Sequence, residues 1–410
     1  MGSTFYLGCQ WLLTVLVVRL FDNADQAYEA AGILSLCLSI TGIFFIICLF
    51  NVRNYQVTEK EGLYTDGDFV FHRILTCLVA FVSCAVFVLI GGYSPYVTLC
   101  VLLYMFFKCI EAMLDVYHGI AQTVWRLDIA GKSYVIRGIL LIFTFFVTLK
   151  LSQNLALSIL LMSVACLIPT LLYDVRLISR LKQVKIKASL GKAKSLTVVC
   201  IPMVLYGICM NSILPVARLL LEHYHGEITL GYYSTVSTVA VLVQSLVSFV
   251  FSPLINLFSD AYQKQDKKAI SSLFVKLILL LAGVTALALG ASFVAEHFKL
   301  LSLVFGSEIE PYAYLLYPTM LASCMTALIW LLGMILVVMR DMKTLFWGSF
   351  AGLLLCVLLG ALTIQKTVYF GTNLAVLASL ALIAVIFLIR FFVYLFSKKE
   401  GVAVKTQDQQ

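Results

Sequence analysis

The stretch Ala31-Gly-Ile-Leu-Ser-Leu-Cys-Leu-Ser-Ile-Thr-Gly-Ile-Phe-Phe-Ile-Ile-Cys-Leu-Phe-Asn-Val52 decides the fold class, because it runs for 22 residues without a charged side chain. About 20 apolar residues in a helix cross the hydrocarbon core of a bilayer. Similar runs recur with short polar gaps, and we expect helices near 4–20, 31–52, 74–92, 95–114, 134–151, 155–173, 196–219, 229–252, 272–293, 313–339, 344–364 and 369–396. The sequence therefore predicts an all-α, polytopic membrane protein of about twelve transmembrane helices.

Composition supports lipid as the main solvent of the chain. Hydrophobic residues make up 62% of the 410 residues and charged residues 12%, against about 25% charged residues in soluble domains. The first apolar run lacks a basic leader and a small-residue cleavage site, so we expect no secretory signal. That run is short for a span, and the start of the chain looks truncated by a turn or two.

The positions of the cysteines predict that their side chains pack among apolar residues and form neither disulfides nor metal sites. The chain has 12 cysteines; nearly all lie in apolar runs and no Cys-x-x-Cys pair occurs. A thiol in such surroundings behaves as a small hydrophobe. We therefore expect no disulfide framework, no metal and no cofactor.

The distribution of basic residues predicts the orientation. If the first gap faces outward, outward positions hold five Lys and Arg, and the other 24 of the 29 fall on the cytoplasmic side. This positive-inside bias predicts that both termini of the membrane protein lie in the cytoplasm. The net charge of +8 is then topological and does not indicate nucleic-acid binding. The richest gap, 174–195, could also contact anionic lipid.

A weak internal repeat divides the chain into two lobes. Arg19, Gly32 and Ser35 each have a counterpart 199 residues later, at Arg218, Gly231 and Ser234. Six helices per half give both halves the same topology, related by a pseudo-two-fold axis along the membrane normal. We expect an N-terminal lobe at 1–173, a basic cytoplasmic linker at 174–195, a C-terminal lobe at 196–397 and a cytoplasmic tail at 398–410.

Charged residues at membrane depth are the candidate functional residues, because a charge there usually lines a cavity or has a partner. Lys108, Glu111 and Asp115 have the spacing of one helical face, which predicts either a charged stripe on a central cavity or an interfacial ion pair. Arg19 and Arg218 end the first and seventh helices, where they either face a cavity or snorkel to the interface.

Two further positions allow two interpretations each. Arg53, at the inner end of the second helix, is either a cavity residue or a positive-inside anchor. Asn211 lies in a seventh helix that also holds Pro202 and Pro215. That helix is either a hinge or gate, or it is an ordinary proline-kinked membrane helix.

One stretch resembles a known family. The sequence Asp115-Val-Tyr-His-Gly-Ile-Ala-Gln122-Thr-Val-Trp-Arg126-Leu-Asp128-Ile-Ala-Gly-Lys-Ser-Tyr-Val-Ile-Arg137 resembles the polysaccharide-export flippases of the multidrug, oligosaccharidyl-lipid and polysaccharide exporter superfamily. In that family a Gln, an Arg-x-Asp, a Gly-x-Ser and an Arg run between the fourth and fifth helices. The opening Arg19-Leu20 followed by Tyr28-Glu-Ala-Ala-Gly32 is similar to the family's first loop.

The resemblance implies a carrier in a bacterial plasma membrane that moves a polyprenyl-diphosphate-linked oligosaccharide from the cytoplasmic to the outer leaflet. A phosphate left unpaired in hydrocarbon costs tens of kcal/mol, so the lobes must enclose a hydrated, cationic cavity within the membrane lipids. We expect Arg19, Arg53, Lys108 and Arg218 to bind the substrate. Proton or cation counter-transport is expected to involve Glu111 or Asp115, and the remaining coupling or cavity candidates are Gln122, Arg126, Arg137 and Asn211.

Three alternatives stay open at this point. A multidrug or cation exporter of the same superfamily would favour acidic residues deep in the first three helices, which hold none. A membrane enzyme such as an oligosaccharide polymerase usually needs a large extramembrane loop, and no catalytic motif appears. A major-facilitator sugar carrier would carry a basic run after Gly67-Asp68, which is missing.

Overall fold

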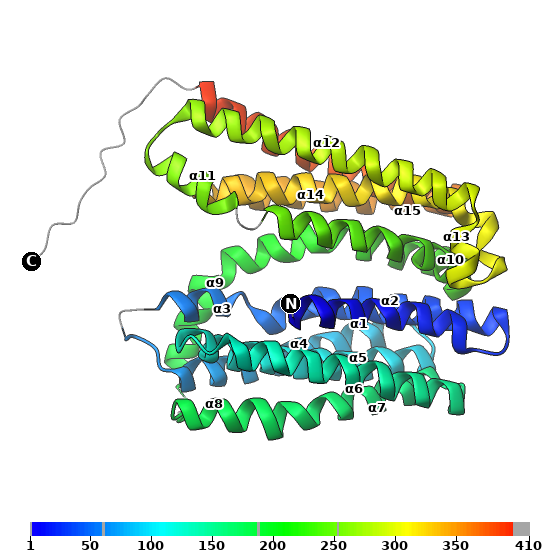
Figure 1. The fold of residues 1–410 in the computed structure, drawn as a ribbon, viewed down its shortest axis with the longest axis horizontal. Helices are drawn as coiled ribbons and strands as arrows, with labels where there is room; N and C mark the ends of the chain where they lie inside the picture. The colour runs from blue at the N-terminus through cyan, green and yellow to red at the C-terminus, as the bar shows by residue number, and fades with distance from the viewer. Residues whose placement is uncertain (1, 60–61, 187–188, 252–253, 397–410) are drawn as a thin grey trace, which may run out of the picture.

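The computed structural model describes residues 2–59, 62–186, 189–251 and 254–396, and no side chain from 242 to 256. The expected tail at 398–410 therefore lies outside the described residues. The N-terminal lobe forms the lower half of Figure 1. Its elements are α1 (Gly2–Leu20), α2 (Ala24–Leu49), α3 (Val52–Thr58), α4 (Asp66–Ile90), α5 (Pro95–Thr123), α6 (Leu127–Ser152), α7 (Leu155–Pro169), a π-helical turn η1 (Thr170–Val175) and α8 (Arg176–Leu181).

The C-terminal lobe forms the upper half of the same view. Its elements are α9 (Leu190–Asn211), α10 (Ile213–Phe251), α11 (Leu254–Gln263), α12 (Lys267–His297), α13 (Leu300–Phe305), η2 (Ser307–Leu315), α14 (Leu316–Val338) and α15 (Met342–Phe396). The long helices of both lobes run roughly parallel to the longest axis of the molecule (Figure 1).

The prediction of twelve membrane-spanning helices is confirmed. Ten helices of the described chain are long and apolar enough to span a membrane. One of them, the 55-residue α15, is broken by non-helical backbone at Thr367 and Val368 and supplies two spans. The part of α10 that follows the non-helical Gly226 adds another, because its 25 residues exceed the length that the hydrocarbon core requires. The chain is thus a multi-pass membrane protein.

Several helices extend beyond the predicted bounds, because polar capping residues start them outside the apolar run. Thr65 and Asp68 form a capping box at the start of α4, so Arg73 lies inside a helix rather than in the predicted gap. Helix α5 continues past the predicted end at 114 as far as Thr123.

The predicted helix at 196–219 is wrong in its bounds, because the structure breaks it at Ser212. Pro215 has no backbone N–H and cannot bond to the carbonyl of Asn211. The chain therefore ends α9 at Asn211 and starts α10 at Ile213, which places Pro215 in a first turn where its missing N–H costs nothing. The break thus lies within the segment that was considered as a hinge.

The internal repeat predicted from sequence appears as a reciprocal contact between α2 and α10. A Cβ added to Gly32 would overlap the carbonyl of Glu227, and a Cβ added to Gly231 would overlap the carbonyl of Tyr28. Gly32 and Gly231, like Tyr28 and Glu227, are equivalent positions of the repeat. Gly32 thus contacts the residue equivalent to Tyr28, and Gly231 contacts Tyr28 itself. A two-fold axis produces such a pair of identical contacts, so the axis passes between α2 and α10.

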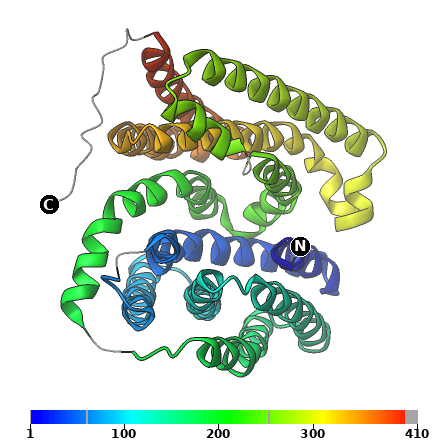
Figure 2. The same cartoon turned by 60° about the vertical axis from the view of Figure 1, so that its left-hand side comes forward.

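The two lobes are packed together unevenly along their length. We call the end with the α1–α2 loop, predicted to lie outside, the outer end, and the opposite end, with α3, α8 and α11, the inner end (Figure 1). The hydrophobic core of the N-terminal lobe continues into α10, α13 and η2, whereas a second core is confined to the C-terminal lobe. Helix α9 contacts α2 and α4 of one lobe and α15 of the other, and it visibly joins the two lobes in Figure 2.

Candidate functional site

Lys108, Glu111 and Asp115 form a charged stripe along one face of α5, and the outer part of this stripe is a carboxylate with three donors. Lys108 Nζ lies 2.6 Å from Glu111 Oε2. Glu111 Oε1 accepts hydrogen bonds from the Tyr6 hydroxyl at 2.7 Å and from Gln10 Nε2 at 2.6 Å. Because every donor favours the charged form of the acceptor, this geometry holds Glu111 as a carboxylate. The stripe therefore links α5 to α1.

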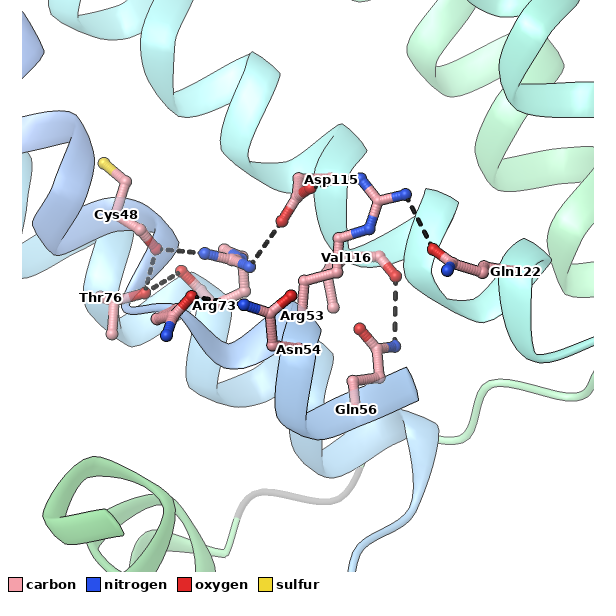
Figure 3. A network of polar contacts seen from close by, with 10 residues as sticks. Cys48, Arg53, Asn54, Gln56, Arg73, Thr76, Asp115, Val116 and Gln122 are labelled. Atoms are coloured by element: carbon pink, nitrogen blue, oxygen red, sulfur yellow. Dashed lines mark hydrogen bonds and ion pairs between the residues drawn. The ribbon is translucent and has the colours of Figure 1, made fainter. Parts of the chain in front are cut away.

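One turn further along, Asp115 lies between two arginines (Figure 3). Its Oδ1 accepts from Arg53 at 2.8 Å and its Oδ2 from Arg73 at 3.0 Å. Arg53 also donates to Gln122 Oε1 at 3.1 Å. The Arg73 side chain is 1% exposed and that of Arg53 31% exposed, so the network reaches from the lobe interior to an accessible surface. Two guanidiniums and one carboxylate leave an excess of one positive charge.

The sequence analysis missed Arg73, because the predicted helix began one residue after it. Its helical position, one turn before Cys77 on α4, follows from the capping box at Thr65. A basic residue within the first two turns of a capped helix is the signal that would have placed it at the inner boundary of the membrane.

A second buried network begins one turn further along α5 than Asp115. His118 Nε2 is 3.1 Å from Asp174 Oδ1, and Ser133 Oγ donates to Asp174 Oδ2 at 2.7 Å. Asp174 belongs to the π-helical turn η1 after Pro169, and such turns occur frequently at functional sites. All three side chains are fully buried. None of the three was predicted as a site residue, since their partners come from different helices.

The structure separates the two arginines of the family-like motif. Arg137 is buried, donates to Thr170 Oγ1 at 2.7 Å and lies 5.9 Å from the centre of the Tyr6 ring. Its Nε and one terminal nitrogen have no partner among the described residues. Arg126 instead lies on the surface, where its side chain is 49% exposed and its Nε is 2.8 Å from Asp128 Oδ1. Only Arg137 of the two thus belongs to the lobe interior.

Arg218 lies where the two lobes meet. It donates to Ser237 Oγ at 2.8 Å, and it forms no ion pair with a carboxylate in the described part of the chain. It lines a cavity of about 20 Å³ together with hydroxyl-bearing residues of α1, α2 and α10, namely Thr14, Ser35, Ser234, Thr235 and Thr238. The Nε of Arg218 and the hydroxyls of Ser35 and Ser39 are buried without a described partner. This is a small cationic site rich in hydroxyl groups.

Asn211 lines a separate cavity of about 170 Å³ in the C-terminal lobe, between α9, α10, α14 and α15. Its side-chain amide donates to the carbonyl of Gly207 at 2.8 Å. The other polar groups of the wall come from Tyr233, Ser237, Thr319, Ser323, Thr326 and Trp330, and the rest of the wall is apolar. Ser237 also accepts the hydrogen bond from Arg218, so this bond connects the wall of the larger cavity to an arginine that lines the smaller one.

Arg19 lies at the outer end and holds the two lobes together there. It donates to the backbone carbonyls of Ser302, Leu303 and Val304 in the last turn of α13. Next to it, Tyr28 stacks on Tyr232 with ring centres 4.0 Å apart. Tyr232 in turn stacks on Tyr312 at 4.3 Å. The outer end is therefore closed by contacts between α1, α2, α10, α13 and η2.

This two-lobed helical bundle has the fold of transporters of the MOP superfamily. It is similar to an inward-facing multidrug resistance transporter of the MATE family (TM-score 0.74, 10% identity, 96% of each chain covered). It is also similar to the lipid II flippase MurJ in an inward closed conformation (TM-score 0.75, 12% identity, 95% of this chain and 86% of that chain).

By sequence, the chain is similar to the capsular polysaccharide biosynthesis protein CapF of Staphylococcus aureus, with 25% identity over 307 residues that cover 73% of this chain and 74% of that protein. No protein-family model matches the sequence. The resemblance to the polysaccharide-export branch of the superfamily, predicted from the motif at 115–137, agrees with this relative.

Proposed function

We propose that the protein is a flippase that moves a polyprenyl-diphosphate-linked oligosaccharide from the cytoplasmic to the outer leaflet by alternating access of its two lobes. The similar proteins support this proposal, because one is named a lipid II flippase and another a capsular polysaccharide biosynthesis protein. Its lobes sit in a bacterial plasma membrane, with both termini in the cytoplasm. The substrate's lipid tail stays in the bilayer while its headgroup crosses between the lobes.

The observation that carries the proposal is the unpaired positive charge of Arg218 between the lobes. A buried charge without a counter-ion is costly, and it is kept where a ligand of opposite charge supplies the partner. A diphosphate is dianionic or more and accepts bidentate hydrogen bonds from a guanidinium. The surrounding Ser and Thr hydroxyls can donate to its remaining oxygens.

The other basic candidates fit successive positions along the route of the headgroup. Arg53, with 31% of its side chain exposed and one positive charge in excess around Asp115, receives the diphosphate at the inner end. Lys108 comes next along the route, on the face of α5 that also holds Asp115. Arg19 is occupied by carbonyls while the outer end is closed, and it becomes available to the diphosphate when that end opens.

Replacing Arg218 by glutamine is expected to lower the initial flipping rate at least about tenfold without destabilising the protein. Removing this guanidinium leaves no buried carboxylate unpaired, so the cost of breaking a buried ion pair does not arise. The measurement uses proteoliposomes with a fluorescent polyprenyl-diphosphate-linked oligosaccharide, together with a melting curve in detergent. Arg126→Gln, which changes a surface arginine, is the control and should transport as the unchanged protein does. Normal flipping by Arg218→Gln would refute the role of this arginine.

The exporter alternative from the same superfamily keeps one supporting observation, the similarity to a multidrug resistance transporter. Against it, the carboxylates of the stripe are already neutralised by Lys108, Arg53 and Arg73. A cationic drug would have to displace these side chains. Export of a cationic dye by the same proteoliposomes, with no movement of the lipid-linked oligosaccharide, would favour the exporter.

For energy coupling we propose that Glu111 exchanges its lysine partner for a proton or cation during the cycle. Glu111→Gln is expected to keep the flipping that occurs without a gradient and to lose its stimulation by an imposed proton or sodium gradient. Flipping is measured with each gradient in turn, and Asp128→Asn serves as the control because that carboxylate lies on the surface. Equal stimulation of Glu111→Gln and the unchanged protein would exclude this coupling and leave the membrane potential, which is worth about 2.3 kcal/mol per charge at 100 mV.

A further inference from the structure

Three cysteines from three different helices meet in the N-terminal lobe. Cys48 on α2, Cys77 on α4 and Cys109 on α5 place their sulfur atoms within 4.8 Å of one another. Cys48 and Cys77 are buried, whereas Cys109 is partly exposed. The sequence analysis assigned all cysteines to packing, since no two of these three lie close together in the sequence.

The spacing of the sulfur atoms suits a metal ion. With metal–sulfur distances of about 2.3 Å, three thiolates around one ion lie about 4 Å apart. The three sulfur atoms of this triad therefore need shifts of less than an ångström or so to share one ion. Soft thiolate ligands select thiophilic metals over Mg²⁺ and Ca²⁺.

The charge environment specifies the valence of the ion. Arg73 lies one helical turn before Cys77 and donates to the backbone carbonyl of Cys48 at 2.5 Å. Its Nε–H is buried and has no partner among the described residues. Arg73 therefore places a positive charge close to the segments of chain that carry Cys48 and Cys77. Three thiolates carry three negative charges; one divalent ion balances two of them, and the single positive charge that Arg53 and Arg73 leave in excess of Asp115 balances the third.

We propose that Cys48, Cys77 and Cys109 form a binding site for a divalent thiophilic ion of the Zn²⁺ and Cd²⁺ class. Binding displaces the thiol protons to solvent and fixes α2, α4 and α5 to one another. A water molecule that enters beside the partly exposed Cys109 is the fourth ligand of the tetrahedral ion. Neutrality matters here because an uncompensated charge at this depth is expensive. The inference is independent of the transported substrate.

The test titrates purified, reduced and chelator-treated protein in detergent with Cd²⁺, and follows the ultraviolet charge-transfer band of Cd²⁺–thiolate bonds. We expect the band to saturate at one Cd²⁺ per chain and to be reversed by excess Zn²⁺. Cys48→Ser, Cys77→Ser and Cys109→Ser should each weaken binding at least tenfold. Cys84→Ser, which changes a buried cysteine on α4 outside the triad, should bind as the unchanged protein does.

A second measurement requires no variant and covers the case in which a serine variant fails to fold. Zn²⁺ should slow alkylation of Cys109 in the unchanged protein at least tenfold, as followed by mass spectrometry of its peptides. Alkylation at the same rate with and without Zn²⁺ overturns the proposal. So does Cd²⁺ binding that the three serine variants and Cys84→Ser share equally, because the remaining cysteines would then explain it.

Discussion

Replacing Gly32 by alanine is expected to keep the outer end from closing and to stop transport. The added Cβ would overlap the carbonyl of Glu227, a backbone atom that cannot rotate away. Overpacking of a tight contact typically costs about 1–3 kcal/mol, and here it falls only on the conformation in which α2 and α10 touch. Gly231→Ala should have an effect of equal size, because it meets the carbonyl of Tyr28 in the same way.

The measurement pairs a flipping assay with a distance between spin labels on the α1–α2 loop and α13. Both alanine variants should lengthen that distance and lower the initial rate at least about tenfold. Gly42→Ala is the matched control on α2, because a Cβ there meets nothing within 4 Å. If Gly32→Ala keeps the label distance and the flipping rate of Gly42→Ala, the close crossing of α2 and α10 is not required for the cycle.

Neutralising Asp115 as Asp115→Asn is expected to cause the largest loss of stability of any single charge removal in the N-terminal lobe. Asp115 on α5 bonds to Arg53 on α3 and to Arg73 on α4, so the change leaves two guanidiniums without their carboxylate. Arg73 is 1% exposed and water cannot replace the partner. Breaking a buried ion pair from one side costs about 3–5 kcal/mol.

Melting curves in detergent and the rate of flipping check this prediction. Asp128→Asn is the control, since its partner Arg126 lies on the surface and water takes over the lost contact. The double variant Arg73→Met with Asp115→Asn should be more stable than Asp115→Asn alone, because it removes the buried positive charge as well. Equal melting temperatures for Asp115→Asn and Asp128→Asn would show that the network around Asp115 does not hold the three helices together.

Much of the architecture could be read from local patterns. Apolar runs gave the twelve spans, and the break predicted between 364 and 369 appears at Thr367 and Val368. The spacing of Lys108, Glu111 and Asp115 correctly placed them on one face of a helix, because the helical period is a property of the chain itself. The 199-residue repeat predicted that Gly32 and Gly231 are equivalent positions, and the structure adds that each contacts the helix of the other.

Partners across helices could not be read in this way. Arg126 and Arg137 belong to the same motif, yet one lies on the surface and the other is buried beside Tyr6. Asp174 was assigned to a basic linker, whereas the π-helical turn places it against His118. The contacts of Arg137 and Asp174 join residues from different helices, and no sequence spacing encodes them. Arg126, by contrast, pairs with Asp128 two residues further on. The substrate roles of Arg19, Arg53, Lys108 and Arg218 accordingly stay predictions that the proposed variants test.

The sequence by itself determined that this chain crosses a membrane about twelve times, that its halves repeat, and which face of α5 is charged. These properties depend on hydrophobicity and on helical periodicity, which act along the chain. Only the tertiary structure decided that Asp115 lies between Arg53 and Arg73, that Arg218 meets hydroxyl groups rather than a carboxylate, and that three thiols converge. Those outcomes depend on how separate helices pack, because charge pairing and ligand geometry act across space over a few ångströms.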